Sequence, residues 1–322
     1  MGRSSFTVRL ARWVQSSPLW LLRFLEWPFV TLLARRSANT QAIFVLALPR
    51  SGSTVTYQMI CHGLSVNYLS NLWHLLYQLP LLGGWLSGLL SQGHHSEFSS
   101  QQGFVSGLDG PAEGLRFWRW WLDCGLSDPD CEMQDRRQHQ RCAGYLCRVL
   151  SVLARRHGPF SSAYLGHTLV PDRVHDAFPG AVLIRLRREP VSNALSLLKS
   201  MRASHTDWFS VLPRECEGLE GASAHERVAL QVYWLNRRLD NASCANEMLD
   251  VHYERLCEHP GKEMERIRQW CQIKGVSVEF KFSLPDKFSY RLADLEADTD
   301  AIKIRQKLDE LEEKHGRLGA AE

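Results

Sequence analysis

A short polar turn follows the first strongly apolar run of the chain and has the composition of an anion site. The apolar run is 42–48 (AIFVLAL), and a helix is predicted over 54–62. The turn between them contains Arg50, Ser51, Gly52, Ser53 and Thr54. Its N–H groups and hydroxyls lie at a helix N-terminus, where the helix dipole favours phosphate or sulfate. Arg50 adds a charge that can stabilise an oxygen atom as a bond to it breaks.

The turn differs from the loop that binds nucleoside triphosphates, whose pattern is GxxxxGK[ST]. In the corresponding window 47–54 (ALPRSGST), both the first Gly and the Lys are absent. A second apolar run, 181–186 (AVLIRL), ends in Arg187 and Arg188 instead of the Asp that binds magnesium in triphosphate chemistry. The pattern therefore favours a phosphosulfate donor without metal. A P-loop small-molecule kinase is the alternative, and magnesium-dependent ATP turnover would reveal it.

The turn and two later segments resemble the donor site of sulfotransferases that use 3′-phosphoadenosine 5′-phosphosulfate (PAPS). LPRSGST is similar to the PKSGTT or PRSGTT loop that binds the 5′-phosphosulfate in that family. In the family an Arg, followed eight residues later by a Ser, holds the 3′-phosphate, and RREPVSNALS supplies Arg188 and Ser196. VHYERLCEHP resembles the segment whose Tyr lies by the adenine, here Tyr253. The resemblance covers the chain from Ala42 to Gly275.

The resemblance implies a P-loop-like, three-layer αβα fold with a mainly parallel central sheet, PAPS as the donor and no metal. An Arg in the loop is typical of the bacterial branch and of its tyrosylprotein relatives, and carbohydrate sulfotransferases are related as well. The soluble aryl-type enzymes carry a Trp where this chain has Val55, and their C-terminal RKGxxGDW segment is missing here. The chain therefore resembles the bacterial branch.

Transfer to a hydroxyl group requires a general base, and several residues could supply it. In the tyrosylprotein relatives a Glu lies about twenty residues beyond the loop Arg, but Asn71 stands at that position here. Glu113 resembles an acidic residue of the bacterial members and is predicted to open a helix near the donor. We expect Glu113 to be the base, with His74 as its rival and His94 and His95 behind both. Arg50 is expected to be catalytic as well as donor-binding.

Two apolar and aromatic stretches bear on the acceptor, namely 72–90 (LWHLLYQLPLLGGWLSGLL) and 117–121 (FWRWW). Such stretches mostly form core. If part of them lines the site, the acceptor is a lipid-like or other apolar alcohol, with a carbohydrate hydroxyl as the alternative. A membrane-associated module that binds the nucleotide without turnover is a further alternative, because no acid aligns with the relatives' Glu.

The elements that would position these residues alternate between strands and helices. The run 42–48 is continuously apolar, as expected of a parallel strand covered on both faces, and 181–186 is similar apart from Arg185. Residues 248–253 are predicted as a third strand. Helices are predicted over 134–157, around Val228 to Leu239, and from Pro190 and Pro260 onward. This order predicts a doubly wound sheet with ligands at the carboxyl ends of its strands.

Composition limits the other classes of function. A net charge of +3, with Lys and Arg in separated groups, argues against nucleic-acid binding. The nine cysteines form no CxxC pair, which predicts reduced thiols rather than a disulfide scaffold. Cys142 and Cys147 would lie on different faces of a helix, so no metal is expected there.

The two ends of the chain are expected to lie outside the catalytic domain, which we place at 41–290. Residues 1–40 include an apolar segment with Arg23, Glu26 and Pro28, which is too charged for a typical membrane-spanning helix. It is predicted to lie in a membrane interface or to pack on the domain, with a signal anchor as a third alternative. We expect a cytoplasmic protein, peripheral on the inner face of a membrane if this segment binds there. The charged tail 291–322 predicts a docking helix, or else a homodimer contact.

Overall fold

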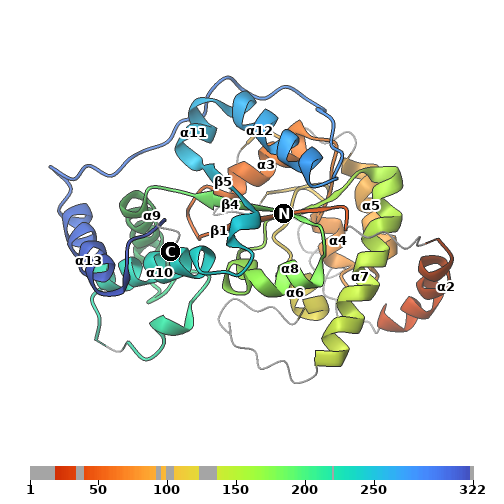
Figure 1. The fold of residues 1–322 in the computed structure, drawn as a ribbon, viewed down its shortest axis with the longest axis horizontal. Coiled ribbons are helices and arrows are strands. Elements are labelled where there is room, and N and C mark those ends of the chain that lie inside the picture. The colour runs from red at the N-terminus through yellow and green to blue at the C-terminus, as the bar shows by residue number, and fades with distance from the viewer. Residues whose placement is uncertain are drawn as a thin grey trace, which may run out of the picture.

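Parallel strands form a central sheet in the order β2-β3-β1-β4-β5 (Figure 1). The computed structural model describes residues 19–33, 40–91, 96–98, 105–122, 136–219 and 221–319. The strands are β1 (Ala42–Ala47), β2 (Asn67–Tyr68), β3 (Phe160–Ser162), β4 (Val182–Arg187) and β5 (Met248–His252). β1 lies between β3 and β4, with Phe44 opposite Ser162 on one side and Leu183 on the other. The predicted α/β fold with a mainly parallel sheet is confirmed.

The burial of β1 and β4 explains why these strands could be predicted. Every residue of β1 is fully buried, and β4 is buried up to Leu186. Their largely apolar sequences therefore match strands that helices cover on both faces. The short strands β2 and β3 contain mostly polar residues and gave no such signal. The third strand was predicted to extend to Tyr253, but β5 ends at His252 and Tyr253 begins a helix.

Helices cover both faces of the sheet. Figure 1 shows α3 and α12 on one side of the central strands and α8 and α10 on the other. The helices are η1 (Leu19–Leu22), α2 (Arg23–Leu33), α3 (Ser53–Gly63), α4 (Asn71–Leu75), α5 (Pro80–Ser91), α6 (Leu115–Leu122), α7 (Arg136–His157), η2 (Leu165–Leu169), α8 (Pro171–Ala177), α9 (Pro190–Ser204), η3 (Arg214–Cys216), α10 (Ala224–Asp240), η4 (Ala245–Glu247), α11 (Tyr253–Glu258), α12 (Pro260–Ile273) and α13 (Thr299–His315). As predicted, Pro190 and Pro260 stand at the first positions of their helices.

The aromatic run 117–121 contributes mainly to the core. Phe117 and Trp118 are fully buried, and Trp121 is 1% exposed. The Trp118 ring lies 5.8 Å from the ring of Phe44 on β1 and 6.1 Å from that of Phe160 on β3. This run therefore fixes α6 against the sheet.

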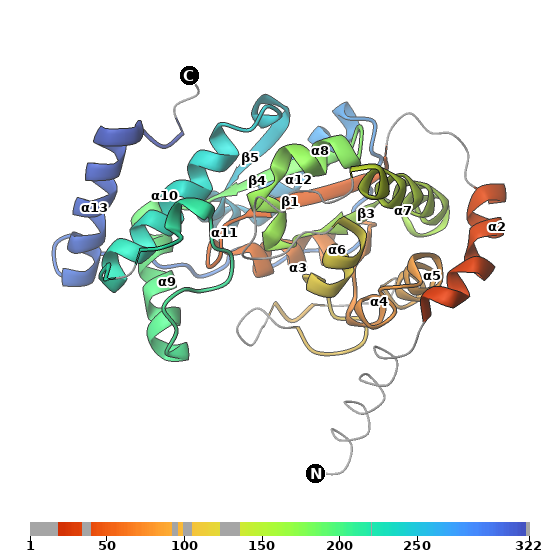
Figure 2. The ribbon, with the colours of Figure 1, turned by 90° about the horizontal axis from the view of Figure 1, so that it is seen from below.

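The two described ends of the chain pack at opposite ends of the molecule, α2 at one and α13 at the other (Figures 1 and 2). Ile304, Leu308 and Leu311 of α13 are buried, and the helix contacts α9 and α10. The tail therefore contains a helix that docks on the domain. Within the described residues, no helix is both long enough and apolar enough to cross a membrane.

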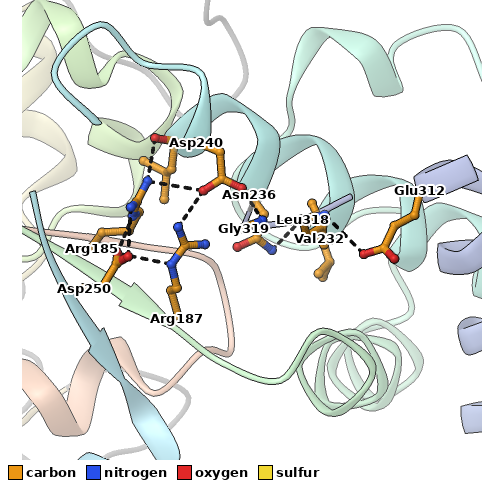
Figure 3. Close-up of polar contacts among 10 residues, drawn as sticks. Arg185, Arg187, Val232, Asn236, Asp240, Asp250, Glu312, Leu318 and Gly319 are labelled. Carbon is orange, nitrogen blue, oxygen red and sulfur yellow. Dashed lines mark hydrogen bonds and ion pairs between the residues drawn. The ribbon is translucent and has the colours of Figure 1, made fainter. Parts of the chain in front are cut away.

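An ion-pair network fixes the carboxyl end of β4. Figure 3 shows Arg185 and Arg187 directed toward Asp240 at the end of α10 and Asp250 on β5. Arg187 donates to Asp240 at 2.6 Å and lies 3.1 Å from Asp250. Burial alone would raise the pKa of Asp250, but hydrogen bonds and charges from the two arginines bring it below its usual value. The second carboxylate oxygen of Asp240 accepts a hydrogen bond from Gly319 N–H, so the segment after α13 joins the same network.

Candidate active site

The turn after β1 has the backbone conformation of an anion-binding loop. Arg50 has a φ of 61° and Gly52 a φ of 94°, both in the left-handed region. The first N–H groups of α3 have no acceptor within the helix and are directed out of its N-terminus. Ser53 and Thr54 lie in that first turn. Because a non-glycine residue such as Arg50 seldom adopts a positive φ, this backbone is held by its surroundings.

Three polar side chains hold the turn in this shape. Ser51 donates from both its N–H and its hydroxyl to the Leu48 carbonyl, at 3.2 and 2.7 Å. Asn193 of α9 is buried and donates to the Pro49 carbonyl at 2.8 Å. Thr168 of η2 accepts from Ala47 N–H at 3.0 Å and donates to its carbonyl at 2.9 Å. Ser51 therefore shapes the loop, and its predicted contact with the donor remains a prediction.

Gly52 and Tyr253 are in close contact across the cleft. A Cβ atom placed on Gly52 would lie 2.1 Å from the Tyr253 ring, which is shorter than any real contact. The Arg188 guanidinium lies over the Tyr253 ring, with its Cζ atom 5.1 Å from the centre of the ring. The loop needs a glycine at this position for two reasons, its positive φ and the ring packed against it.

Replacing Gly52 by Ala is expected to weaken the binding of adenosine 3′,5′-bisphosphate by about tenfold or more, because the strained backbone and the displaced ring distort the loop. Isothermal titration calorimetry measures this change. The control is Gly144→Ala on α7, where a Cβ atom would meet nothing within 4 Å. That variant should bind normally and melt at a slightly higher temperature, because Ala favours helix. Unchanged affinity in Gly52→Ala would show that the loop does not contact the ligand.

Arg188 lies two residues before α9, and Ser196 lies in the second turn of this helix. Arg188 donates to the Arg50 carbonyl at 2.6 Å and lies 3.4 Å from the Arg291 carbonyl. Ser196 accepts a hydrogen bond from the Arg50 side chain at 3.4 Å. Glu189 caps α9 by accepting from the N–H groups of Val191 and Ser192, at 3.0 and 2.6 Å. The predicted pair is thus joined to the loop by direct contacts.

The predicted residues line one cleft of about 350 Å³. Its lining consists of Pro49, Arg50, Gly52, Ser53, Thr54, Val55, Glu113, Leu165, Arg188, Ser196, Phe209 and Tyr253. Residues separated by some 200 positions in sequence therefore meet at the carboxyl ends of β1 and β4. This is the edge at which parallel sheets bind ligands.

Glu113 faces the same cleft from a segment bound to the far edge of the sheet. It lines the cleft with Ser53 and Thr54, and burial raises the pKa of its carboxyl to about 7. The residue lies two positions before α6, so it precedes the helix that it was predicted to open. A carboxyl group with this pKa is suited to accept a proton at neutral pH.

Asn71 holds the segment that carries Glu113. Its side chain donates to the carbonyls of Val105 and Gly107, at 2.8 and 2.7 Å, and its N–H donates to Gly110 at 2.9 Å. Ala112 N–H adds a bond to the Leu69 carbonyl at 2.7 Å. Asn71, at the position expected to match the Glu of the tyrosylprotein relatives, therefore supports the loop that contains Glu113.

The other candidate bases have different surroundings. His74 lies on α4, and burial, reinforced by the charge of Arg116, lowers its pKa. It does not occur among the described residues that line the cleft. His94 and His95 lie outside the described residues. Glu113 is thus the candidate that the geometry brings to the loop.

A comparison with protein families bears directly on this arrangement. The sequence pattern of the sulfotransferase family matches residues 42–277, well over half of the chain. The chain belongs to the sulfotransferase family. The matched region of this family member begins at β1 and includes the turn, Glu113, Arg188, Ser196 and Tyr253.

Solved structures of similar fold are also sulfotransferases. The sulfotransferase STF9 from Mycobacterium avium has a TM-score of 0.50 and 16% identity, covering 94% of this chain and 80% of its own. STF1 from Mycobacterium tuberculosis H37Rv has a TM-score of 0.43 and 16% identity, covering 90% and 75%. The sulfotransferase domain of the Synechococcus PCC 7002 olefin synthase has a TM-score of 0.38 and 18% identity, covering 76% of each chain. No curated protein matches the chain in sequence.

Several residues of this family member could not be identified as part of the site from sequence. Asn193 and Thr168 act on the loop from elements distant in sequence, and Leu165 and Phe209 form apolar walls of the cleft. Asn193 had one usable signal, since it is a polar residue three positions before Ser196. Among the described residues, no group of three or more His, Cys, Asp or Glu side chains could hold a metal ion.

Proposed function

We propose that this protein transfers a sulfuryl group from PAPS to an acceptor hydroxyl, with Glu113 as the general base. The observation that carries the proposal is the single cleft that joins the anion-binding turn, Arg188 and Ser196 with a carboxyl group whose pKa is about 7. A kinase is disfavoured, because this loop lacks the lysine that binds the β- and γ-phosphates.

The residues of the cleft fit the chemical groups of this donor. The N–H groups and hydroxyls of Ser53 and Thr54, with Arg50, suit the 5′-phosphosulfate at the start of α3. Arg188 and Ser196 suit the 3′-phosphate, and the Tyr253 ring lines the cleft, where the adenine can lie beside it. In the loaded enzyme, the donor would supply the sulfuryl group to be transferred.

Each group then has a defined part in the transfer. Glu113 takes the proton of the acceptor hydroxyl as its oxygen forms a bond to sulfur. The bond from sulfur to the 5′-phosphate oxygen breaks, and adenosine 3′,5′-bisphosphate leaves. Arg50 and the N–H groups of α3 stabilise the negative charge that grows on the leaving oxygen. The proton on Glu113 returns to solvent before the next turnover.

The described walls of the cleft favour an acceptor with an apolar body. Val55, Leu165 and Phe209 line it beside Glu113. Phe209 is held by Gln231, whose side chain donates to its carbonyl at 2.8 Å. These three side chains form an apolar part of a cleft whose other lining residues are mostly polar. That part suits the body of a lipid-like or other apolar alcohol. A carbohydrate hydroxyl is the second candidate.

Calorimetric titration with adenosine 3′,5′-bisphosphate, and separately with ATP and magnesium, tests the donor. We expect micromolar binding of the bisphosphate and little response to ATP. The opposite preference would reject a sulfotransferase and support a small-molecule kinase. Incubation with PAPS and a panel of apolar alcohols and sugars then tests turnover. Bisphosphate binding without product from any acceptor would support an inactive nucleotide-binding module.

A further inference from the structure

An apolar surface lies at the end of the molecule formed by α2, α5 and α7. Figure 2 shows α2 at the edge of the fold, beside α5 and α7. On α2, Phe24 is 72% exposed and Leu32 is 84% exposed. On α5, Trp85, Leu89 and Leu90 are each more than 40% exposed. Large apolar side chains gathered on neighbouring helices indicate a surface that binds something. We call it the α2/α5 surface.

Glu26 fixes α2 to the domain, so the exposure of its apolar side chains is built into the fold. The carboxylate is 8% exposed and accepts hydrogen bonds from Leu82 N–H at 2.8 Å and Leu81 N–H at 3.4 Å. These N–H groups belong to the first turn of α5, where a negative charge is favoured. Tyr145 of α7 contributes a longer contact of 3.5 Å to the same carboxylate. The Glu26 carboxylate of α2 thus faces the protein, while several apolar side chains of the same helix are exposed.

A groove of about 520 Å³ runs between the three helices. Leu25 and Phe29 of α2, Leu82 and Trp85 of α5, and Val152 of α7 are among the residues that line it. Arg156, at the C-terminal end of α7, lies at the same groove. The groove is apolar along its length and cationic at that end, which suits the hydrocarbon and the anionic headgroup of a lipid.

The charge of this region has one sign. Glu26 is the single acid in the sequences of α2, α5 and α7, and it is buried. α7 contains no acid and ends in the exposed Arg155 and Arg156. A second copy of the chain would bring the same positive charges together across a two-fold axis, so the charge disfavours a dimer here. An anionic lipid surface complements it.

We propose that the α2/α5 surface binds the interface of an anionic lipid bilayer, with the apolar side chains of α2 and α5 in the headgroup region and Arg155 and Arg156 on lipid phosphates. This inference goes beyond the sulfuryl transfer and does not depend on it. It extends the expectation for residues 1–40 to α5 and α7, which the sequence did not connect with a membrane. Such helices bind through buried apolar area and attraction to anionic headgroups.

Vesicle flotation tests the proposal. The full chain should float with vesicles of equal parts phosphatidylcholine and phosphatidylglycerol, and far less with phosphatidylcholine alone. Raised salt should weaken the binding. The double variant Phe24→Ser, Leu32→Ser should weaken it by about tenfold or more, since two exposed apolar side chains no longer enter the interface.

The matched control is Ile273→Ser, Leu292→Ser, which removes two side chains of similar exposure, 73% and 58%, far along the chain from α2. It should bind vesicles like the wild type. Melting temperatures confirm that both variants fold. Failure of the wild type to float, or equal flotation of the α2 variant, overturns the proposal. A wild-type dimer in light scattering that the α2 variant converts to monomer, without vesicle binding, also overturns it and assigns the surface to a second copy.

Discussion

Replacing Glu113 by Gln is expected to lower turnover by about 10²- to 10⁴-fold, while affinity for adenosine 3′,5′-bisphosphate stays within about twofold. Gln keeps the shape of the side chain but cannot accept the proton of the acceptor. Product formation from PAPS and calorimetry measure the two quantities. Glu97→Gln, which changes an exposed carboxylate, is the control and should keep full activity. Normal turnover in Glu113→Gln would remove Glu113 as the base and return attention to His74.

The pH dependence gives a second readout for Glu113. Burial raises the pKa of its carboxyl to about 7, so the base is protonated at lower pH. The rate should fall below pH 7 and reach a plateau above it. The stability of the fold changes in the opposite direction to the rate. It falls as the pH rises, because the folded state binds this proton more tightly than the unfolded state. Glu113 therefore destabilises the fold above pH 7. Glu113→Gln should melt at a higher temperature than the wild type at pH 8, and this difference should shrink below pH 5.

Replacing Arg188 by Ala is expected to weaken the binding of adenosine 3′,5′-bisphosphate by about 10- to 100-fold, and the binding of adenosine 5′-phosphate by much less. Only the bisphosphate carries the 3′-anion that the guanidinium would bind. Both ligands should lose some affinity, because Arg188 also donates to the Arg50 carbonyl at 2.6 Å. The ratio of the two losses, measured by calorimetry, is therefore the decisive quantity.

Two further variants control for charge and geometry in the Arg188 experiment. Arg305→Ala removes an equal charge from an exposed position on α13 and should change neither affinity. Arg188→Lys keeps the charge but loses the planar fork of donors, so it should recover part of the bisphosphate affinity. Equal losses for the two ligands in Arg188→Ala would mean that Arg188 supports the loop without binding the 3′-phosphate.

Much of the fold could be predicted because its central elements have local signals. β1 is a continuous apolar run, β4 is apolar apart from its two arginines, and prolines mark the starts of α9 and α12. The strands β2 and β3 are two and three residues long, and their place in the sheet depends on pairing with distant residues. No periodicity can appear in so few residues, so these edge strands were not predicted.

In the candidate site too, residues in local motifs could be predicted, whereas residues placed by distant contacts could not. Arg50, Arg188 and Ser196 lie in contiguous motifs at strand ends, and they meet in one cleft. The apolar side chains of the cleft could not be predicted. The aromatic run 117–121 was one of two candidates for them, but its residues Phe117 and Trp118 are buried in the core. Phe209 comes instead from a loop with no distinctive pattern. The role of Asn71 depends on carbonyl groups of Val105 and Gly107, which no sequence pattern could place beside it.

The network at the end of β4 has a consequence for the speed with which a ligand reaches the cleft. Asp240 and Asp250 neutralise Arg185 and Arg187 at close range, so these two arginines add little to the field outside the protein. Arg188, which lines the cleft, donates to backbone carbonyls instead of carboxylates, so these partners do not neutralise its charge. The electrostatic potential is thereby focused on Arg50, Arg188 and the N-terminus of α3. A multiply charged anion diffusing nearby is drawn to that one opening, and counterions at physiological ionic strength limit this attraction to about 8 Å.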